Sequence, residues 1–195
     1  MSQTRARRQM ARKARTQRAV FVDRDGCVIS DENFLCDPAR VRVLPGVTQA
    51  IRDLHDAGYL VIVVTNQSAV ARGMLTEKLL EQIHERLQAE LAQEDARLDA
   101  IYYCPHLAEG KVKAYAKECE CRKPEPGMIL RAAREHKINL ADSYMVGDAE
   151  RDVEAGLAAG CHAILISANA EASTKAEAVR ANLAAAAELI LSKQA

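Results

Sequence analysis

The feature that most constrains the fold is a repeated alternation between short apolar runs and longer amphipathic stretches. Continuous short apolar runs are typical of strands that a parallel sheet buries on both faces. Because helical patterns separate them, the sequence predicts an α/β fold: a Rossmann-like, doubly wound parallel sheet with helices on both faces. The predicted strands lie at residues 19–23, 59–65, 100–103, 144–147 and 163–166.

The stretches between these runs carry helix signals. Leucines and an isoleucine recur on one face between residues 76 and 92, and Thr76 is a suitable N-cap for them. Gly160 follows the helix expected at residues 150–159, and glycine is a residue that commonly ends a helix. The segment at residues 104–126 has no clear period, and a loop of this length is usually functional. Further helices are expected at residues 48–57, 126–136, 150–159 and 175–192.

Length and composition narrow the class of protein. The 195 residues suit one ordinary domain, and no apolar run approaches the roughly 20 residues that cross a bilayer. The first apolar run is too short for a secretory signal. We therefore expect a cytoplasmic protein whose six cysteines are reduced.

Charge is distributed unevenly although its net value is zero. Seven of the 27 Lys and Arg residues precede the first acid, Asp23, which leaves 20 bases against 27 acids in the rest of the chain. We expect residues 1–17 to form a flexible basic arm on an acidic body. One function that this arm allows is nucleic-acid binding by a zinc-stabilised protein, and this is the non-enzyme alternative to the enzymatic function considered below.

Two carboxylates follow the first apolar run. Asp23 and Asp25 leave the end of the predicted strand and enter a turn at Gly26. Ligand sites in open α/β sheets lie at this edge, and a cation between two close anions relieves their repulsion. Magnesium suits such oxygen ligands, although an acidic turn without a metal would show the same residues.

Polar side chains also follow two other predicted strands. Thr65 ends the second run and Ser68 follows it, so hydroxyls and backbone N–H groups there could hold phosphate oxygens. Asp148 comes directly after the run at residues 144–147. Glu150 and Asp152 are better explained by the dipole of the next helix, which favours acids in its first turn.

A basic pair, Arg122 and Lys123, precedes Pro124 at the end of the long loop. A lysine is a compact positive charge that suits a transferring phosphoryl group, whereas an exposed basic turn would carry no chemistry. Three strand ends supply acids and donors, and this loop supplies the counter-charge. If one crevice collects them, the combination favours phosphoryl transfer, which is catalysed mainly by positioning and charge stabilisation.

These residues carry a family resemblance. The chain resembles the haloacid dehalogenase superfamily of phosphatases in four ordered motifs between residues 18 and 168: DRDG, TNQS, RKP and VGD. It resembles the heptose bisphosphate branch, and next to it the histidinol-phosphate phosphatases, in the longer patterns TNQSAVARG, IYYCPH, CECRKPEPGM and SYMVGD. The resemblance implies a phosphatase domain at residues 18–195. The chain has no room for a large cap domain, so we expect a cleft covered only by loops.

The resemblance implies a role for each motif residue. Asp23 would be the nucleophile that forms an aspartyl-phosphate, and Asp25 would be the general acid and base. Magnesium would be held by the side chains of Asp23 and Asp148 and the backbone carbonyl of Asp25. Thr65 and Lys123 would bind the phosphoryl oxygens. The residues implied to contact the rest of the substrate are Asp31, Glu32, Asn33, Phe34, Asn66, Gln67, Ser68 and Arg122.

The resemblance also implies a substrate, D-glycero-D-manno-heptose 1,7-bisphosphate, which would lose its 7-phosphate. Histidinol phosphate or another small metabolite is the alternative. Arg72 and Arg122 could serve the second phosphate. Two residues depart from the pattern: Cys27 stands where such proteins have Thr, and Ala149 stands where they have Lys. We expect a small phosphorylated partner, no nucleic acid and a monomer.

The long loop carries a candidate zinc site. One residue separates Cys104 from His106, and one separates Cys119 from Cys121. Three thiols and one imidazole can close a tetrahedral structural zinc site, and the resemblance strengthens this expectation. Reduced cysteines beside an unrelated surface histidine would show the same spacing. Zinc would stiffen the loop at residues 104–121 and position the basic pair that follows it.

Overall fold

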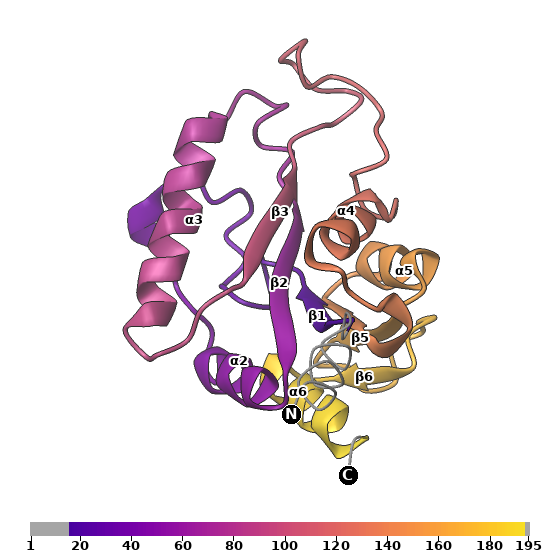
Figure 1. Ribbon diagram of the computed structural model, residues 1–195. Helices are drawn as coiled ribbons and strands as arrows, with labels where there is room; N and C mark the ends of the chain where they lie inside the picture. Colours follow the sequence, from indigo (N-terminus) through magenta and orange to yellow (C-terminus); the bar gives the residue numbers. More distant parts are fainter. Residues whose placement is uncertain (1–15, 194–195) are drawn as a thin grey trace, which may run out of the picture.

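The sheet has the parallel topology that the sequence predicts. The computed structural model describes residues 16–193, and Figure 1 shows a central sheet between two layers of helices. Every strand pairing is parallel, and the order is β3-β2-β1-β4-β5-β6. This order reverses between β1 and β4, so a ligand is expected at the carboxyl ends of these two strands. The strands are β1 (Arg18–Val22), β2 (Tyr59–Asn66), β3 (Ala100–Cys104), β4 (Tyr144–Gly147), β5 (His162–Ile166) and β6 (Ala178–Arg180).

Local signals set the ends of the helices. The Thr76 hydroxyl accepts a hydrogen bond from the Leu79 backbone N–H, a cap that contributes about 1 kcal/mol. Gly160 ends α5 with a left-handed φ of 88°. Four of the predicted helices are confirmed to within one residue at each end. The helices are α2 (Val47–Asp56), α3 (Glu77–Ala92), α4 (Gly127–His136), α5 (Glu150–Ala159), α6 (Leu183–Ser192) and the short 3-10 helices η1 (Pro38–Arg40) and η2 (Leu140–Asp142).

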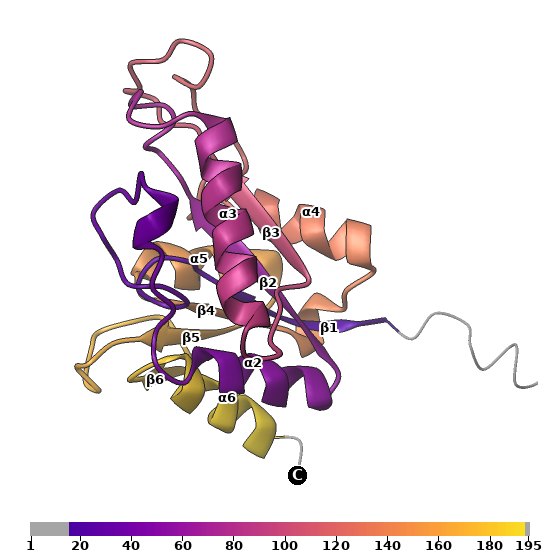
Figure 2. The same cartoon turned by 90° about the vertical axis from the view of Figure 1, so that its left-hand side faces the viewer.

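Alternate residues of β1 pack on opposite faces of the sheet. Val20 and Val22 face a core completed by α2, α3 and α6, whereas Phe21 faces a core completed by α4 and α5. All three side chains are fully buried. Figures 1 and 2 show these helical layers on the two sides of the sheet. Each buried side chain of this size contributes about 1.5–3 kcal/mol, so the sheet is a rigid support for groups at its edge.

The predicted helix at residues 175–192 is wrong in its first half. Residues 178–180 form β6, which pairs with β5 through the registers Ile164 to Ala178 and Ile166 to Arg180. Val179 packs against a small cluster that includes Leu165. The Asn182 side chain then accepts a hydrogen bond from Ala185 N and begins α6. Strand pairing and a side-chain cap therefore outweigh the helix propensity of the alanines here.

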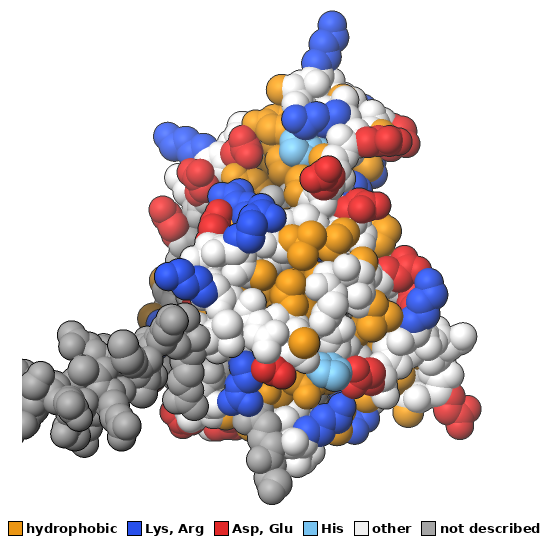
Figure 3. Space-filling model, turned by 45° about the vertical axis from the view of Figure 1, so that its right-hand side comes forward, with side chains coloured by type: hydrophobic (Ala, Val, Ile, Leu, Met, Phe, Trp, Pro, Cys, Tyr) orange, Lys and Arg blue, Asp and Glu red, His pale blue; other side chains and the backbone are white. Residues whose placement is uncertain are grey.

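Two loops rise above the carboxyl edge of the sheet, and no cap domain covers that edge in the described residues. The longer loop joins β3 to α4 and stands at the top of Figures 1 and 2. No helix among residues 16–193 is long and apolar enough to cross a membrane. The basic arm predicted at residues 1–17 falls almost wholly outside the described residues. On the face in Figure 3, cationic and anionic side chains are intermingled, so no continuous basic surface appears there.

Candidate active site

The ends of β1, β2 and β4 bring the predicted catalytic residues to one edge of the sheet. Asp23 follows β1 directly, and its backbone N–H donates to the Val146 carbonyl of β4 at 3.0 Å. Asp148 follows β4 by one residue, and Thr65 lies near the end of β2. The strand pairing itself therefore places these side chains side by side, at the point where the strand order reverses.

Three carboxylates meet at this edge. One oxygen from each of Asp23, Asp148 and Asp152 lies within 4.8 Å of the others. Gly26, with φ 74°, packs tightly on this group, because a Cβ there would lie 2.1 Å from Asp148 Oδ2. Only glycine fits that turn without displacing the acid.

Mutual repulsion among these acids suits a divalent cation. Asp148 is open to solvent on one side, yet desolvation first, and the charges of Asp23 and Asp152 second, raise its pKa to about 6. A cation between Asp23 and Asp148 would remove that repulsion. The donors are hard carboxylate oxygens, which fit magnesium better than a soft metal.

Lys123 neutralises the buried side of the cluster. Its ammonium lies 2.9 Å from Asp23 Oδ1 and 2.7 Å from Asp152 Oδ1, and it donates to the Val64 carbonyl at 2.7 Å. Only 2% of the residue is exposed. Burial would lower the pKa of Lys123, but the charges of Asp23 and Asp152 outweigh this and raise it. Lys123 is therefore a fixed cation beneath the site.

Asp152 is a site residue that the sequence did not predict, because its position in the first turn of α5 was attributed to the helix dipole. The side chain is fully buried, and its Oδ2 accepts a hydrogen bond from Ala149 N at 3.0 Å. A Cβ on Gly147 would lie 2.2 Å from the Asp152 Cβ. The one available signal was its spacing of four residues after Asp148, which cannot show that the side chain faces the sheet.

Two neighbours, Arg24 and Gln67, hold the Asp25 carboxylate. Arg24, only 1% exposed, pairs with it at 2.9 Å through Nη2, and Gln67 donates Nε2–H to its Oδ2 at 2.9 Å. Arg24 Nη1 also lies 3.3 Å from His84 Nε2 on α3. Burial first, and the charge of Arg24 second, lower the pKa of His84 to about 3, so its ring is neutral. His84 is thus a buried residue of α3 whose ring contacts the guanidinium that holds Asp25.

The residues after β2 support the site from below. The Thr65 hydroxyl accepts a hydrogen bond from Gln67 Nε2 at 2.9 Å. Asn66 uses both ends of its amide on Lys123: its Oδ1 accepts from Lys123 N and its Nδ2 donates to Lys123 O, each at 3.0 Å. Asn66 thus holds the basic pair against β2 and, in this arrangement, serves as a support for the lysine.

A cavity of about 340 Å³ opens above these residues. Glu32 does not line it, because its carboxylate pairs with Arg40. Thr65 and Lys123 are buried beneath it. Arg24 and Arg151 do line it, although the sequence predicted neither. A larger cavity, of about 650 Å³, lies beside β3 and contains none of the strand-end acids. The predicted residues on the wall of the smaller cavity are Asp23, Asp25, Asp31, Asn33, Phe34, Asn66, Gln67, Ser68, Arg122 and Asp148.

Phe34 stands at the rim of this cavity. It is an exposed aromatic residue with a left-handed φ of 79°, and the Arg72 guanidinium lies 5.4 Å from the centre of its ring. Arg72 does not line the cavity, so the sequence-based suggestion that it serves a second phosphate gains no support. Its visible contact is the face of the aromatic ring, a cation–π arrangement.

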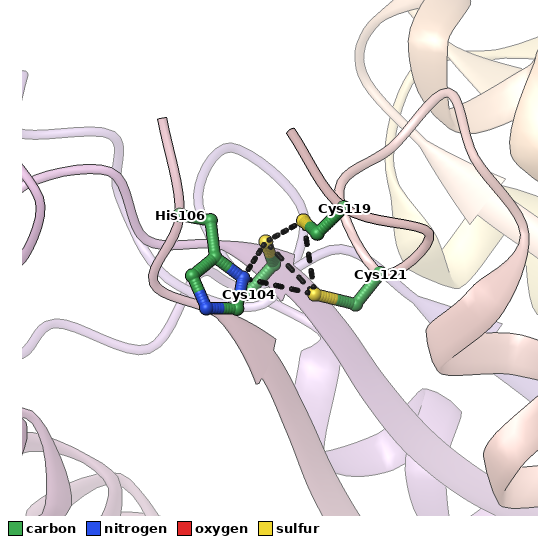
Figure 4. A group of neighbouring side chains, drawn as sticks. All are labelled: Cys104, His106, Cys119 and Cys121. Atoms are coloured by element: carbon green, nitrogen blue, oxygen red, sulfur yellow. Dashed lines mark hydrogen bonds between the residues drawn. The ribbon is translucent and has the colours of Figure 1, made fainter. Parts of the chain in front are cut away.

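The four predicted zinc ligands point toward one another, as Figure 4 shows. The sulfur atoms of Cys104, Cys119 and Cys121 are 3.2–3.5 Å apart, and His106 Nδ1 lies 3.3 Å from the Cys121 sulfur and 3.7 Å from that of Cys104. A tetrahedron with metal–sulfur bonds of about 2.3 Å has edges of roughly 3.8 Å. The donor set and its size therefore fit zinc, which has no open position left in such a site.

The loop at residues 104–121, which carries these four side chains and is called the zinc loop below, lies next to a residue of the cavity wall. Arg122, next to Cys121, donates Nη1–H to the His106 carbonyl at 3.1 Å. On the other side of the loop, the Tyr115 hydroxyl donates to Glu77 Oε2 at 2.6 Å, and the Tyr103 hydroxyl donates to Oε1 of the same residue at 3.0 Å. The first residue of α3 thus ties this loop to β3. Movement of the loop would carry Arg122 with it.

Proteins of known function are similar to this chain over most of its length. A sequence profile described as HAD-hydrolase-like matches residues 120–191. The D-glycero-beta-D-manno-heptose-1,7-bisphosphate 7-phosphatase of Rhodopseudomonas palustris is 42% identical over 151 residues, which cover 77% of this chain and 84% of that protein. The Escherichia coli K12 protein of the same name is 42% identical over 146 residues, 75% of this chain and 76% of that one.

A solved structure shows the same likeness in three dimensions. The D,D-heptose 1,7-bisphosphate phosphatase from B. bronchiseptica, complexed with magnesium and phosphate, superposes with a TM-score of 0.77 at 35% identity. The match covers 91% of this chain and 99% of that one. The likeness thus extends over both whole folds rather than over single motifs.

Proposed function

We propose that this chain, which belongs to the HAD-like hydrolases and to their heptose bisphosphate phosphatase branch, hydrolyses the 7-phosphate of D-glycero-beta-D-manno-heptose 1,7-bisphosphate. The observation that carries the proposal is the meeting of Asp23, Asp148 and Lys123 at one sheet edge, below a cavity that Arg122 and Arg151 also line. Such a site neutralises phosphate and presents a carboxylate to it.

Asp23 is the proposed nucleophile. Its Oδ1 is held by Lys123 at 2.9 Å and by Arg24 N–H at 2.8 Å, which leaves Oδ2 to attack phosphorus. The P–O bond to the sugar breaks as the Oδ2–P bond forms, so the phosphoryl group moves onto Asp23. Thr65 and Lys123 would bind its oxygens, because Lys123 lies 2.9 Å from Asp23 Oδ1 and Thr65 contacts Gln67, which lines the cavity.

Asp25 is the proposed general acid and base. It gives its proton to the leaving sugar oxygen, and then takes a proton from the water that opens the aspartyl-phosphate. Inorganic phosphate leaves and Asp23 returns to its starting state. Arg24 and Gln67 fix the Asp25 carboxyl group, so both transfers start from one geometry.

Asp23, Asp148 and the backbone carbonyl of Asp25 are the proposed magnesium ligands. When bound there, magnesium supplies positive charge that offsets the repulsion between the anionic nucleophile and the anionic phosphate. We propose a structural zinc ion at Cys104, His106, Cys119 and Cys121, which would hold Arg122 at the cavity wall. The cysteines are unpaired, which supports a reducing compartment such as the cytoplasm.

The test is phosphate release from a panel of substrates with magnesium present. The panel contains the heptose 1,7-bisphosphate, fructose 1,6-bisphosphate and histidinol phosphate. We expect kcat/KM for the heptose bisphosphate to exceed the others by about tenfold or more, the value of one good extra contact. Phosphorus NMR of the product should show that the anomeric phosphate remains.

Other outcomes assign other functions. A preference for histidinol phosphate would replace the substrate but keep the chemistry. No release from any phosphate ester by the folded, magnesium-loaded protein would end the phosphatase proposal. Salt-sensitive binding of nucleic acid that is lost when residues 1–17 are deleted would then favour the non-enzyme alternative.

A further inference from the structure

The cationic side chains around the active-site cavity differ in how far they are already used. Arg24 pairs with Asp25, and Lys123 pairs with Asp23 and Asp152. Arg122 donates to a backbone carbonyl of the zinc loop. Within residues 16–193, the side chain of Arg151 makes no hydrogen bond or ion pair, although it lines the same cavity. Arg151 is therefore the cationic side chain on the cavity wall that is available to bind a ligand.

The backbone of Arg151 is fixed although its side chain is exposed. It is the second residue of α5, and the next residue, Asp152, is fully buried and bound to both Lys123 and Ala149 N. Its charge acts on Asp148 and lowers the pKa of that acid, against the larger effects that raise it. Arg151 thus acts on the charge of Asp148, but it is not one of the proposed catalytic or magnesium-binding residues.

The walls of the cavity differ in charge. The loop between β1 and α2 supplies Asp31 and Asn33, which suit sugar hydroxyls and disfavour a phosphate. The zinc loop and α5 supply Arg122 and Arg151, whose guanidinium groups suit a phosphate because they can donate two parallel hydrogen bonds. A ligand with a second anionic group would be oriented toward the arginines.

A bisphosphate leaves one phosphate without a partner in the catalytic machinery. Lys123, Thr65 and magnesium would serve the phosphoryl group that is transferred. We propose that Arg151 is a specificity-determining residue that binds the phosphate that is not cleaved. This inference rests on the proposed bisphosphatase function, and it assigns the preference for a doubly charged substrate to a residue outside the catalytic motifs.

The test compares two substrates that differ only in the second phosphate: the heptose 1,7-bisphosphate and the heptose 7-phosphate. For Arg151→Ala we expect KM for the bisphosphate to rise about tenfold with kcat changed less than twofold, because a contact made equally in the ground and transition states is lost. KM for the 7-phosphate should not change. Arg151→Lys should keep part of the preference, since it retains charge but not the planar fork.

Arg134→Ala is the matched control, because Arg134 is an exposed arginine on α4 that does not line the cavity. It should leave both KM values unchanged. If the wild-type enzyme prefers the bisphosphate and Arg151→Ala keeps that preference, the role of Arg151 is wrong while the proposed function stands. If the wild-type enzyme shows no preference for the bisphosphate, the substrate assignment fails and the inference falls with it.

Discussion

The catalytic edge, meaning Asp23, Asp25, Thr65 and Asp148 at the strand ends, and the zinc loop at residues 104–121 hold their side chains in different ways. Asp23, Thr65 and Asp148 lie in or directly beyond buried strands, and Asp25 lies in the turn that follows β1. The zinc loop has no regular structure beyond Cys104, and its four candidate ligands are its densest cross-link. The edge is therefore preorganised by the hydrophobic core, whereas we expect the loop to gain much of its order from a bound metal.

The two regions also differ in their charge and in the type of donor atom that they present. At the edge, three acids and one buried lysine leave a net negative charge that a hard cation can balance. In the loop, three thiols and one imidazole meet, which are softer donors than carboxylates. The pKa of Cys121 is lowered to about 5, chiefly by its hydrogen bond with Cys104, which favours the thiolate form that a zinc ion would bind. The carboxylates of the edge therefore favour a hard metal ion such as magnesium, and the thiols of the loop favour a softer one such as zinc.

The largest effect is expected when the proposed nucleophile alone is removed. Asp23→Asn should lower kcat by about 10⁴-fold or more, because an amide cannot form the covalent intermediate. The zinc content and the far-ultraviolet circular dichroism should stay at their wild-type values, since the two regions are supported independently. More than about a tenth of the wild-type kcat in this variant would show that Asp23 is not the nucleophile.

The second prediction concerns the buried ion pair under the edge. Asp152→Ala leaves Lys123 with one of its two carboxylate partners, so we expect the free energy of unfolding to fall by about 3 kcal/mol and kcat to fall by about 100-fold. Urea unfolding and steady-state kinetics measure the two effects.

Glu154 provides the matched control on the same helix. It pairs with Lys175 at the surface, so Glu154→Ala should change stability by less than about 0.5 kcal/mol. Equal losses in the two variants would contradict a special role for the buried acid.

The third prediction tests the loop. Cys119→Ser should remove zinc, raise the rate of proteolysis within residues 104–121 and lower kcat/KM about tenfold, because Arg122 loses its support. Residual turnover should still depend on Asp23. Cys36→Ser is the control, since Cys36 lies outside the cluster. A fully active wild-type protein with no zinc in metal analysis would overturn the structural role.

The smallest effect concerns repulsion at the edge. In metal-free protein, Asp148→Asn should raise the free energy of unfolding by less than about 1 kcal/mol, because a like charge is removed. The folded pKa of about 6 lies above the ordinary 3.8, so ionisation of Asp148 destabilises the fold. This penalty is complete above pH 6 and absent below the ordinary pKa, and the gain from the substitution should vanish there.

Thermal unfolding with and without magnesium measures this fourth prediction. Magnesium should stabilise the wild-type protein and have little effect on Asp148→Asn, because binding only the folded state raises its stability. A wild-type protein that magnesium does not stabilise at millimolar concentration would argue against the site.

Residues next to strand ends were predictable, and residues on helices were not. An acid that follows a short apolar run must lie at the carboxyl edge of a parallel sheet, so Asp23 and Asp148 needed only the strand prediction. His84, Asp152 and Arg151, which all lie on helices, became visible only in three dimensions. Whether a helical side chain faces the sheet, the cleft or solvent depends on how the helix is rotated against its neighbours, which apolar spacing defines poorly near the first turn.

From the sequence, the lengths and positions of the apolar runs predicted the layer architecture and the strand-end acids, because these are local properties of the chain. The pairing of the two cysteine-containing motifs was predicted from their spacing together with the family resemblance. Tertiary structure decided that residues 178–180 are a strand, that Glu32 turns to Arg40 and that Lys123 lies between two acids. These outcomes depend on strand pairing and on charge neutralisation between residues far apart in the chain, and no local pattern encodes such pairings.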